Sequence, residues 1–286
     1  MGTARKKHHL TAAFALIGQL CSAQQIQVSG ACQLGGANPD YIGDIALDGN
    51  GYVYVIGTLD QQIVVGKRKP DCQWVWMETW GTSGSDRGLG IELDQAGHVY
   101  LTGFLNSGAV SYAGETVGSA TGGLFVAQLD TSSTWNWIAT STVWSVNSAG
   151  IVVDDAGDVY VSGDHNPAFE PMTFGSILVP TNGNDDVFLA KVSADGEWQW
   201  AKDLYSAQWL GVQPSMSFSD IEVGKSGSIA IGGRFAGYEA IFDADTIETT
   251  HHYPCGEGVA FYLASYRPDG TVNWARTADP VPAGLS

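Results

Sequence analysis

Residues Ile151 to Gly163 read I-V-V-D-D-A-G-D-V-Y-V-S-G, and this stretch decides the fold because its pattern occurs four times in the chain. Apolar residues lead into Asp154, a short turn ends at Gly157, and a second apolar run follows. Aspartate accepts hydrogen bonds from turn amides and glycine adopts positive φ, so the pattern predicts two strands joined by a tight turn. The other copies are Ile45–Gly57, Ile91–Gly103 and Ile221–Gly233.

A second hairpin follows each copy after a gap of variable length. Its clearest form is Phe188–Val192, a turn at Ala194-Asp195-Gly196, and Trp198–Ala201. Asp-Gly between two apolar runs is a strong hairpin signal. Each repeat is therefore predicted to form four antiparallel strands. The equivalent hairpins join residues 64–68 to 74–76, 125–129 to 135–138, and 262–266 to 272–275.

The spacing of the repeats predicts how the four-stranded units assemble. Their first isoleucines, Ile45, Ile91, Ile151 and Ile221, lie 46, 60 and 70 residues apart. Strands such as Val159–Val161 are apolar on both faces and must be covered on both faces, which the stacking of sheets achieves. Four-stranded units at about this period are typical of β-propeller blades, whereas a β-helix uses shorter repeats. We therefore expect a propeller rather than a β-helix or a β-sandwich.

The composition agrees with an all-β protein. Of the 286 residues, 44% are hydrophobic and only 15% are charged, and the chain contains 37 glycines and 10 tryptophans. Such a mixture is poor in residues that favour helix surfaces and rich in turn formers and strand fillers.

These motifs resemble a known repeat. The core D-x-x-G-x-V-Y-V-x-G, the strand F-[LV]-A-[KQ]-[LV] and the hairpin D-G-x-x-x-W are similar to the SBBP-type β-propeller repeat of secreted bacterial proteins, over roughly residues 24–278. The resemblance implies a secreted or cell-surface propeller, often from the Bacteroidetes lineage and often joined to a C-terminal sorting domain, which is not visible in this sequence. The fourth copy departs from the pattern, with Gly224 in place of aspartate and Ala230 in place of tyrosine.

The repeats give an expected domain plan. We expect a signal peptide at residues 1–23 and one propeller domain at 24–286. Four complete units and one stray strand do not obviously close a ring, so we expect an incomplete or partial propeller of six to eight blades, with a closed four-bladed ring as the alternative. The expected repeats span about 43–80, 88–141, 148–204 and 218–278, and the additional strand spans 26–32.

The N-terminus has the pattern of a secretory signal peptide. Basic residues Arg5–Lys7 precede an apolar run at Leu10–Leu20, and small residues follow. The run is shorter than the roughly 20 residues that span a bilayer, so a retained anchor is the weaker interpretation. Lipoprotein cleavage before Cys21 is a further alternative, although Leu20 is bulky for that peptidase. We expect a secreted or outer-surface protein without an integral membrane segment after cleavage.

Charge and cysteine content limit the partners and the redox chemistry. The formal net charge is −17, and it becomes −20 without residues 1–23, which hold three basic residues and no acidic one. Such a surface repels nucleic acid and anionic membranes. Cys32, Cys72 and Cys255 follow the predicted cleavage site, so at most one disulfide forms, most plausibly between Cys32 and Cys72.

No catalytic, cofactor-binding or metal-binding signature is present in the sequence. The turn aspartates Asp48, Asp94 and Asp154 lack the ligand pattern of a calcium loop, so we interpret them as turn caps. His251 and His252 are adjacent, so on an extended segment they point to opposite sides rather than to one metal. The tryptophans recur at fixed places in the repeats, which indicates packing between blades rather than exposed stacking on sugars.

The variable gaps between the second and third strands are the remaining candidate sites, because repeat proteins often bind ligands on such insertions. Oxygen-rich loops suit cations and hydroxyl groups, although ordinary solvated loops are the simpler interpretation. The third gap carries Asp164, His165, Asn166, Glu170, Asn182, Asn184, Asp185 and Asp186. The fourth carries Asp243, Asp245, Glu248, His251, His252 and Tyr253.

The sequence therefore predicts a secreted or cell-surface scaffold that binds an extracellular protein or a glycan, for example in adhesion, without catalysis and without a cofactor. The alternative is a polysaccharide-degrading or other hydrolytic propeller enzyme with carboxylates from the third and fourth gaps. The sequence does not name the ligand, the blade number or the oligomeric state, because a fold alone does not specify a reaction.

Overall fold

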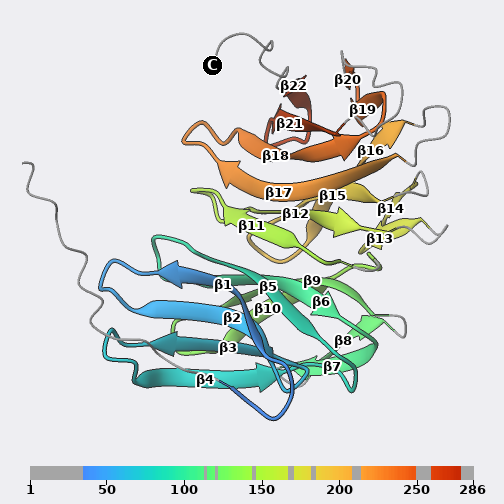
Figure 1. The fold of residues 1–286 in the computed structure, drawn as a ribbon. Coiled ribbons are helices and arrows are strands. Elements are labelled where there is room, and N and C mark those ends of the chain that lie inside the picture. Colours follow the sequence, from blue (N-terminus) through green and yellow to red (C-terminus); the bar gives the residue numbers. More distant parts are fainter. Residues whose placement is uncertain are drawn as a thin grey trace, which may run out of the picture. The chain divides into compact units, whose positions relative to one another are not determined.

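The structure of the protein is a computed structural model, and it describes residues 35–112, 115–119, 122–143, 146–166, 171–181, 185–207, 214–248 and 259–277 (Figure 1). All described residues belong to one compact unit. Every regular element within the described ranges is a β-strand, which confirms the all-β prediction. No helix in these ranges is long and apolar enough to cross a membrane.

Each sequence repeat forms one antiparallel four-stranded sheet, as predicted. The four main strands of each sheet pair in chain order. Their numbers are not always consecutive, because short hairpins are inserted between the second and third strands of some sheets. The first sheet contains β1 (Tyr41–Leu47), β2 (Val53–Leu59), β3 (Gln62–Arg68) and β4 (Trp74–Trp80), and the second contains β5 (Arg87–Leu93), β6 (Val99–Leu105), β9 (Gly123–Leu129) and β10 (Trp135–Thr140). The third contains β11 (Ala149–Val153), β12 (Val159–His165), β15 (Asp186–Val192) and β16 (Trp198–Ala207), and the fourth contains β17 (Ser215–Val223), β18 (Ile229–Ala236), β21 (Val259–Tyr266) and β22 (Val272–Thr277).

The repeated turn has the same two backbone hydrogen bonds in every sheet. In the third sheet, the amide of Gly157 donates to the carbonyl of Asp154, and Gly157 has a φ of 84°. The Asp154 carboxylate accepts hydrogen bonds from the amides of Ala156 and Asp158, at 2.9 and 3.0 Å. The prediction that this aspartate caps the turn is confirmed. The fourth repeat forms the same backbone turn with Gly224 in place of aspartate.

The sheets stack face to face, and the core lies between them. Three clusters of buried side chains fill the junctions between the first and second, second and third, and third and fourth sheets. Strands β1, β5, β11 and β17 contact one another in series, which places the first strand of each sheet innermost, as in a propeller. Among the described strands, extensive contacts join each sheet only to its sequence neighbours, so the four sheets form a partial propeller.

Tryptophans on the outermost strands connect each sheet to the next. The indole Nε1 of Trp76 donates to the carbonyl of Thr131, at 2.8 Å, in the β9–β10 turn of the second sheet. Trp137 makes the same bond to Ala194 in the third sheet, at 2.9 Å. Trp200 makes it to Pro268 in the fourth, at 3.0 Å. We call this bond the tryptophan latch, and it confirms the packing role predicted for these residues.

Within the described residues, the second, third and fourth gaps each contain a short hairpin, where the sequence suggested solvated loops. Their apolar residues explain the difference, because Val110, Phe174 and Phe242 are buried against the sheets. The hairpin of the fourth gap pairs with β16 of the third sheet and so extends that sheet to six strands. The hairpins are β7–β8 (Gly108–Tyr112 and Glu115–Ser119), β13–β14 (Met172–Phe174 and Ile177–Val179) and β19–β20 (Glu239–Phe242 and Asp245–Glu248).

Several sequence predictions fall outside the described residues. These are the signal peptide, the additional strand at 26–32, and the residues Glu170, Asn182, Asn184, His251, His252 and Tyr253. Cys72 is disulfide-bonded. Because Cys32 and Cys255 both lie outside the described residues, the pairing of Cys72 with Cys32 stays a prediction.

Candidate functional site

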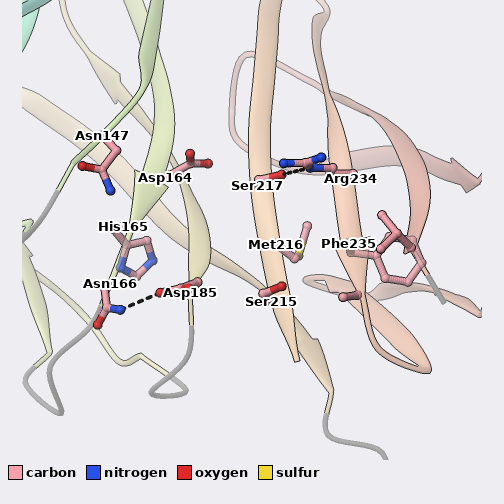
Figure 2. Close-up of a pocket in the computed structure, with 12 residues that line it drawn as sticks. Asn147, Asp164, His165, Asn166, Asp185, Ser215, Met216, Ser217, Arg234 and Phe235 are labelled. Carbon is pink, nitrogen blue, oxygen red and sulfur yellow. Dashed lines mark hydrogen bonds between the residues drawn. The ribbon is translucent and has the colours of Figure 1, made fainter. Parts of the chain in front are cut away.

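A polar pocket of about 450 Å³ lies between the third and fourth sheets (Figure 2). One side is formed by the end of β12 and by Asp185, which directly precedes β15, and the other side is formed mainly by β17 and β18. The buried Met216 and Phe235 also line it, so the pocket has an apolar part. Its polar lining includes Asp164, Asn166, Asp185, Ser215, Ser217 and Arg234.

Backbone contacts between the two sheets hold the pocket in shape. The amide of Met216 donates to the carbonyl of Asp185 at 2.6 Å, and Asp185 forms an isolated parallel bridge with Ser215. The Asp164 carboxylate accepts hydrogen bonds from the Phe218 amide and, at 2.7 Å, from the Ser148 hydroxyl. The bonds of the Met216 and Phe218 amides cross the junction between the third and fourth sheets, whereas the Ser148 bond lies within the third. Asp164, Ser217 and Arg234 therefore lie on strands that are fixed to one another, and Asn166 and Asp185 directly adjoin strands β12 and β15.

Two pairs of side chains give the pocket its charge pattern (Figure 2). The Asn166 amide donates to the Asp185 carboxylate at 2.5 Å, and Arg234 Nε donates to the Ser217 hydroxyl at 3.1 Å. Burial raises the pKa of Asp164, and the nearby negative charge of Asp185 raises it further, against the lowering effect of its hydrogen bonds. The pocket therefore offers carboxylates on one side and a guanidinium on the other.

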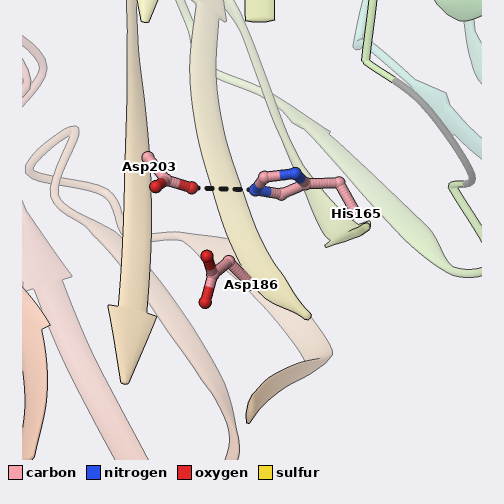
Figure 3. A group of neighbouring side chains, drawn as sticks. All are labelled: His165, Asp186 and Asp203. Atoms are coloured by element: carbon pink, nitrogen blue, oxygen red, sulfur yellow. Dashed lines mark hydrogen bonds and ion pairs between the residues drawn. The ribbon is translucent and has the colours of Figure 1, made fainter. Parts of the chain in front are cut away.

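A buried cluster of three titratable residues lies beside the pocket (Figure 3). His165 Nε2 lies 2.8 Å from Asp203 Oδ1, and the two side chains are 0% and 5% exposed. Asp186 pairs with His165 across the sheet, and one ligand atom from each of the three residues lies within 4.8 Å of the others. One nitrogen and two oxygens at this spacing are groups that can ligate a divalent cation, and they can equally form a buried ion pair.

The structure brings some of the residues predicted in the third gap together at one site. Asp164, His165, Asn166 and Asp185 line one pocket, whereas Asp186 belongs to the buried cluster. In the fourth gap, Asp243 forms an ion pair with Lys202 at 2.8 Å and Asp245 accepts a hydrogen bond from the Ala275 amide, so both have structural partners. Sequence reasoning missed Asp203, Ser217 and Arg234, because only the pairing and stacking of the strands bring them to this edge.

The stacked sheets of four antiparallel strands define the protein as a β-propeller type of all-β protein. Residues 32–58 match the β-propeller repeat named SBBP, which confirms for this stretch the resemblance expected from the sequence.

Comparisons beyond the repeat family give little more. Drosophila Plexin A in complex with Semaphorin 1b is among the solved structures that match, at 11% sequence identity and a TM-score of 0.28. The match covers 80% of this chain and 52% of the plexin chain, so this chain spans about half the length of that protein. Such a distant likeness carries no argument about function. A comparison with curated protein sequences gave no match.

Proposed function

We propose that the protein is a secreted or cell-surface β-propeller scaffold that binds an extracellular ligand, a carbohydrate or a protein, without chemical turnover. The observation that carries the proposal is the polar pocket between the third and fourth sheets. Carboxylate, amide, hydroxyl and guanidinium groups surround an apolar floor there, which is the usual character of a site that orients a polar ligand. Sheet-borne residues supply a fixed geometry, so little conformational entropy is lost when a ligand binds.

A glycan-cleaving enzyme is the second candidate, and one observation favours it. Asp164 has a raised pKa and lies near Asp185, and glycoside hydrolysis uses one protonated and one ionised carboxyl group. Against this, both Asp164 oxygens accept hydrogen bonds, from the Phe218 amide and the Ser148 hydroxyl. A carboxyl group that holds two sheets together is poorly placed to deliver a proton, so the binding function fits the geometry better.

Binding to glycan and extracellular-protein arrays, followed by titration calorimetry and an assay for released reducing ends, tests the proposal. We expect saturable binding without product, and we expect Asp185→Asn and Asn166→Ala to weaken it by roughly tenfold each, the effect of one hydrogen bond to a charged group. Asp155→Asn is the matched control, because Asp155 is an exposed turn residue of the same sheet. Binding that both pocket variants leave unchanged would contradict the site. Turnover that Asp164→Asn abolishes would support the enzyme instead.

A further inference from the structure

Three neighbouring strands of the third sheet build the buried cluster of His165, Asp186 and Asp203. His165 ends β12, and Asp186 begins β15 and pairs directly with it. Asp203 on β16 pairs with Phe188, which lies two residues after Asp186 on β15. Side chains alternate along a strand, so paired residues and residues two positions apart share one face of a sheet. The three polar side chains therefore lie on the same face, and Figure 3 shows the Asp203 carboxylate facing the imidazole with Asp186 beside the pair.

The other sheets show that the fold does not require ionisable residues at these three positions. The register identifies the equivalent residues, because each of the four described sheets pairs its strands in the same order. Among these sheets, only the third has an ionisable side chain at any of the three positions. A joint change at three positions that meet only in the folded sheet indicates a role beyond holding the sheet together. The equivalents are Leu59, Leu105 and Phe235 for His165, Gln62, Gly123 and Ala260 for Asp186, and Thr79, Thr140 and Thr277 for Asp203.

Burial makes the imidazole of this cluster costly to the fold. The His165 side chain is 0% exposed, and its Nδ1 atom has no hydrogen-bond partner within the described ranges. The ring of Phe188 lies 6.3 Å from the imidazole, so the surroundings are partly apolar. Buried polar groups destabilise a fold unless they are hydrogen-bonded, and buried charged groups are paired or bound to a metal ion. The leucine at the same position of the second sheet avoids this cost, so a ligand that binds the cluster would explain why the third sheet bears it.

We propose that His165, Asp186 and Asp203 bind one divalent transition-metal ion, and that Zn²⁺ is the ion that fits best. Imidazole nitrogen and carboxylate oxygen are both zinc ligands, whereas Ca²⁺ and Mg²⁺ favour about six or more ligands that are nearly all oxygen. A divalent ion matches the charge of two carboxylates beside a neutral imidazole. Three protein ligands leave the fourth position of a tetrahedral zinc ion to a water molecule or to another ligand.

The spacing of the ligand atoms suits zinc after a small movement. One ligand atom from each of the three residues lies within 4.8 Å of the others, and His165 Nε2 lies 2.8 Å from Asp203 Oδ1. Zinc bonds of about 2.0–2.2 Å hold two tetrahedral ligands roughly 3.4 Å apart, so these two atoms must separate by roughly half an ångström. The imidazole binds the ion in its neutral form, so the ion takes the place of the hydrogen bond between His165 and Asp203.

Titration of the full chain with zinc chloride, by calorimetry and by metal analysis after removal of free zinc, tests the proposal. The informative variant combines His165→Leu, Asp186→Ala and Asp203→Thr, because other sheets of this chain carry these residues at the same positions. We expect the wild type to bind one zinc ion more than this variant. Asp186→Asn and Asp203→Asn should each weaken zinc binding by roughly tenfold or more. His98→Asn is the matched control, because His98 lies 2.7 Å from Asp94 but its side chain is 41% exposed.

Thermal unfolding with and without zinc separates a site built into the fold from loose binding to exposed histidines. A ligand that binds only the folded state raises the Tm, so zinc should raise the Tm of the wild type and of His98→Asn but not that of the triple variant. A triple variant that keeps the zinc content and affinity of the wild type would overturn the proposal and leave the cluster as a buried ion pair. If the triple variant does not fold, the two asparagine variants decide, because unchanged zinc affinity in both would equally overturn it.

Discussion

Trp137 on the outermost strand of the second sheet donates its indole proton to the carbonyl of Ala194, 2.9 Å away in the third sheet. The bond joins residues 57 positions apart in the sequence, and it recurs at both other junctions of the described sheets. Each junction therefore combines an apolar interior with one directed bond at its outer rim. The apolar contact supplies most of the stabilisation, and the bond fixes how far one sheet slides on the next.

Replacement of Trp137 by phenylalanine should lower the free energy of unfolding by about 1 kcal/mol beyond the loss of ring area, because the Ala194 carbonyl loses its donor. Urea unfolding followed by fluorescence and circular dichroism measures the change. Trp274→Phe is the matched control, since Trp274 donates no such bond within the described ranges. Equal losses from the two variants would show that the latch contributes nothing.

The opening isoleucines should differ in their contribution to stability although their sequence context is the same. Ile151→Ala should cost about 2–5 kcal/mol, because it opens a cavity in the junction of the second and third sheets. Ile45→Ala should cost less than about 1 kcal/mol, because Ile45 is 57% exposed. Thermal unfolding of both variants at low protein concentration checks the comparison. Similar losses would mean that the face of Ile45 is covered.

Gly196 combines two constraints that can be separated by substitution. It has a φ of 87°, and a Cβ atom there would lie 2.8 Å from ring carbons of Trp137. Gly196→Ala should therefore cost about 1 kcal/mol for the backbone and about 1–3 kcal/mol more for the displaced indole. Gly51→Ala is the control, since Gly51 has a φ of 80° but its nearest neighbour would lie 3.8 Å away. Chemical denaturation of both variants should show a larger loss of unfolding free energy at Gly196 than at Gly51. Equal losses would mean that contact with the indole costs nothing and that only the backbone conformation matters.

Tyr100 should make the fold sensitive to alkaline pH. Burial is the main cause that raises the pKa of Tyr100 to about 12; the hydrogen bond from Gln128 opposes it and the negative charge of Asp94 adds to it. The ordinary pKa is about 10, so the folded state binds the proton more tightly than the unfolded state. The stabilisation is present below about pH 10 and is lost as pH rises from 10 towards 12.

Unfolding free energies measured between pH 8 and pH 11.5 test this prediction, with Tyr100→Phe as the control. The wild-type protein should lose stability more steeply than the variant in this window, because only the wild type carries the phenol at position 100. Parallel slopes would contradict the raised pKa. Burial also raises the pKa of Tyr160, Tyr262 and Tyr266, so a steep remaining slope in the variant is expected.

The local structure of each sheet was predictable from the sequence because it depends on neighbouring residues. The period-two apolar strands, the Asp154 turn with its Gly157, and the tryptophan hairpin all use contacts within one repeat. The repeat also predicted that β12 is covered on both faces, and Val159, Tyr160 and Val161 are fully buried. Stacking of sheets followed from this, because a sheet with two apolar faces needs a neighbour on each side.

The gaps and the candidate site were predicted less well. Residues such as Phe174 and Phe242 make the gaps into buried hairpins, but their partners belong to other strands and are not visible in the local pattern. The pocket was only half predicted, because Asp164 and Asp185 lie in one gap whereas Arg234 comes from the next repeat. Asp203 joins His165 only through the pairing of β15 with β16.

The sequence by itself determined the repeat, the four-stranded sheets and their turns, since these depend on side-chain alternation and local hydrogen bonds. It also determined that each sheet has two apolar faces that must be buried. The tertiary structure decided which faces are covered. Ile45 and Ile151 open the same motif, yet one is 57% exposed and the other 5% exposed, because burial depends on the neighbouring sheet rather than on the residue. It also decided that Asp164 holds two sheets together beside the pocket, since a contact between repeats forms only when the sheets stack.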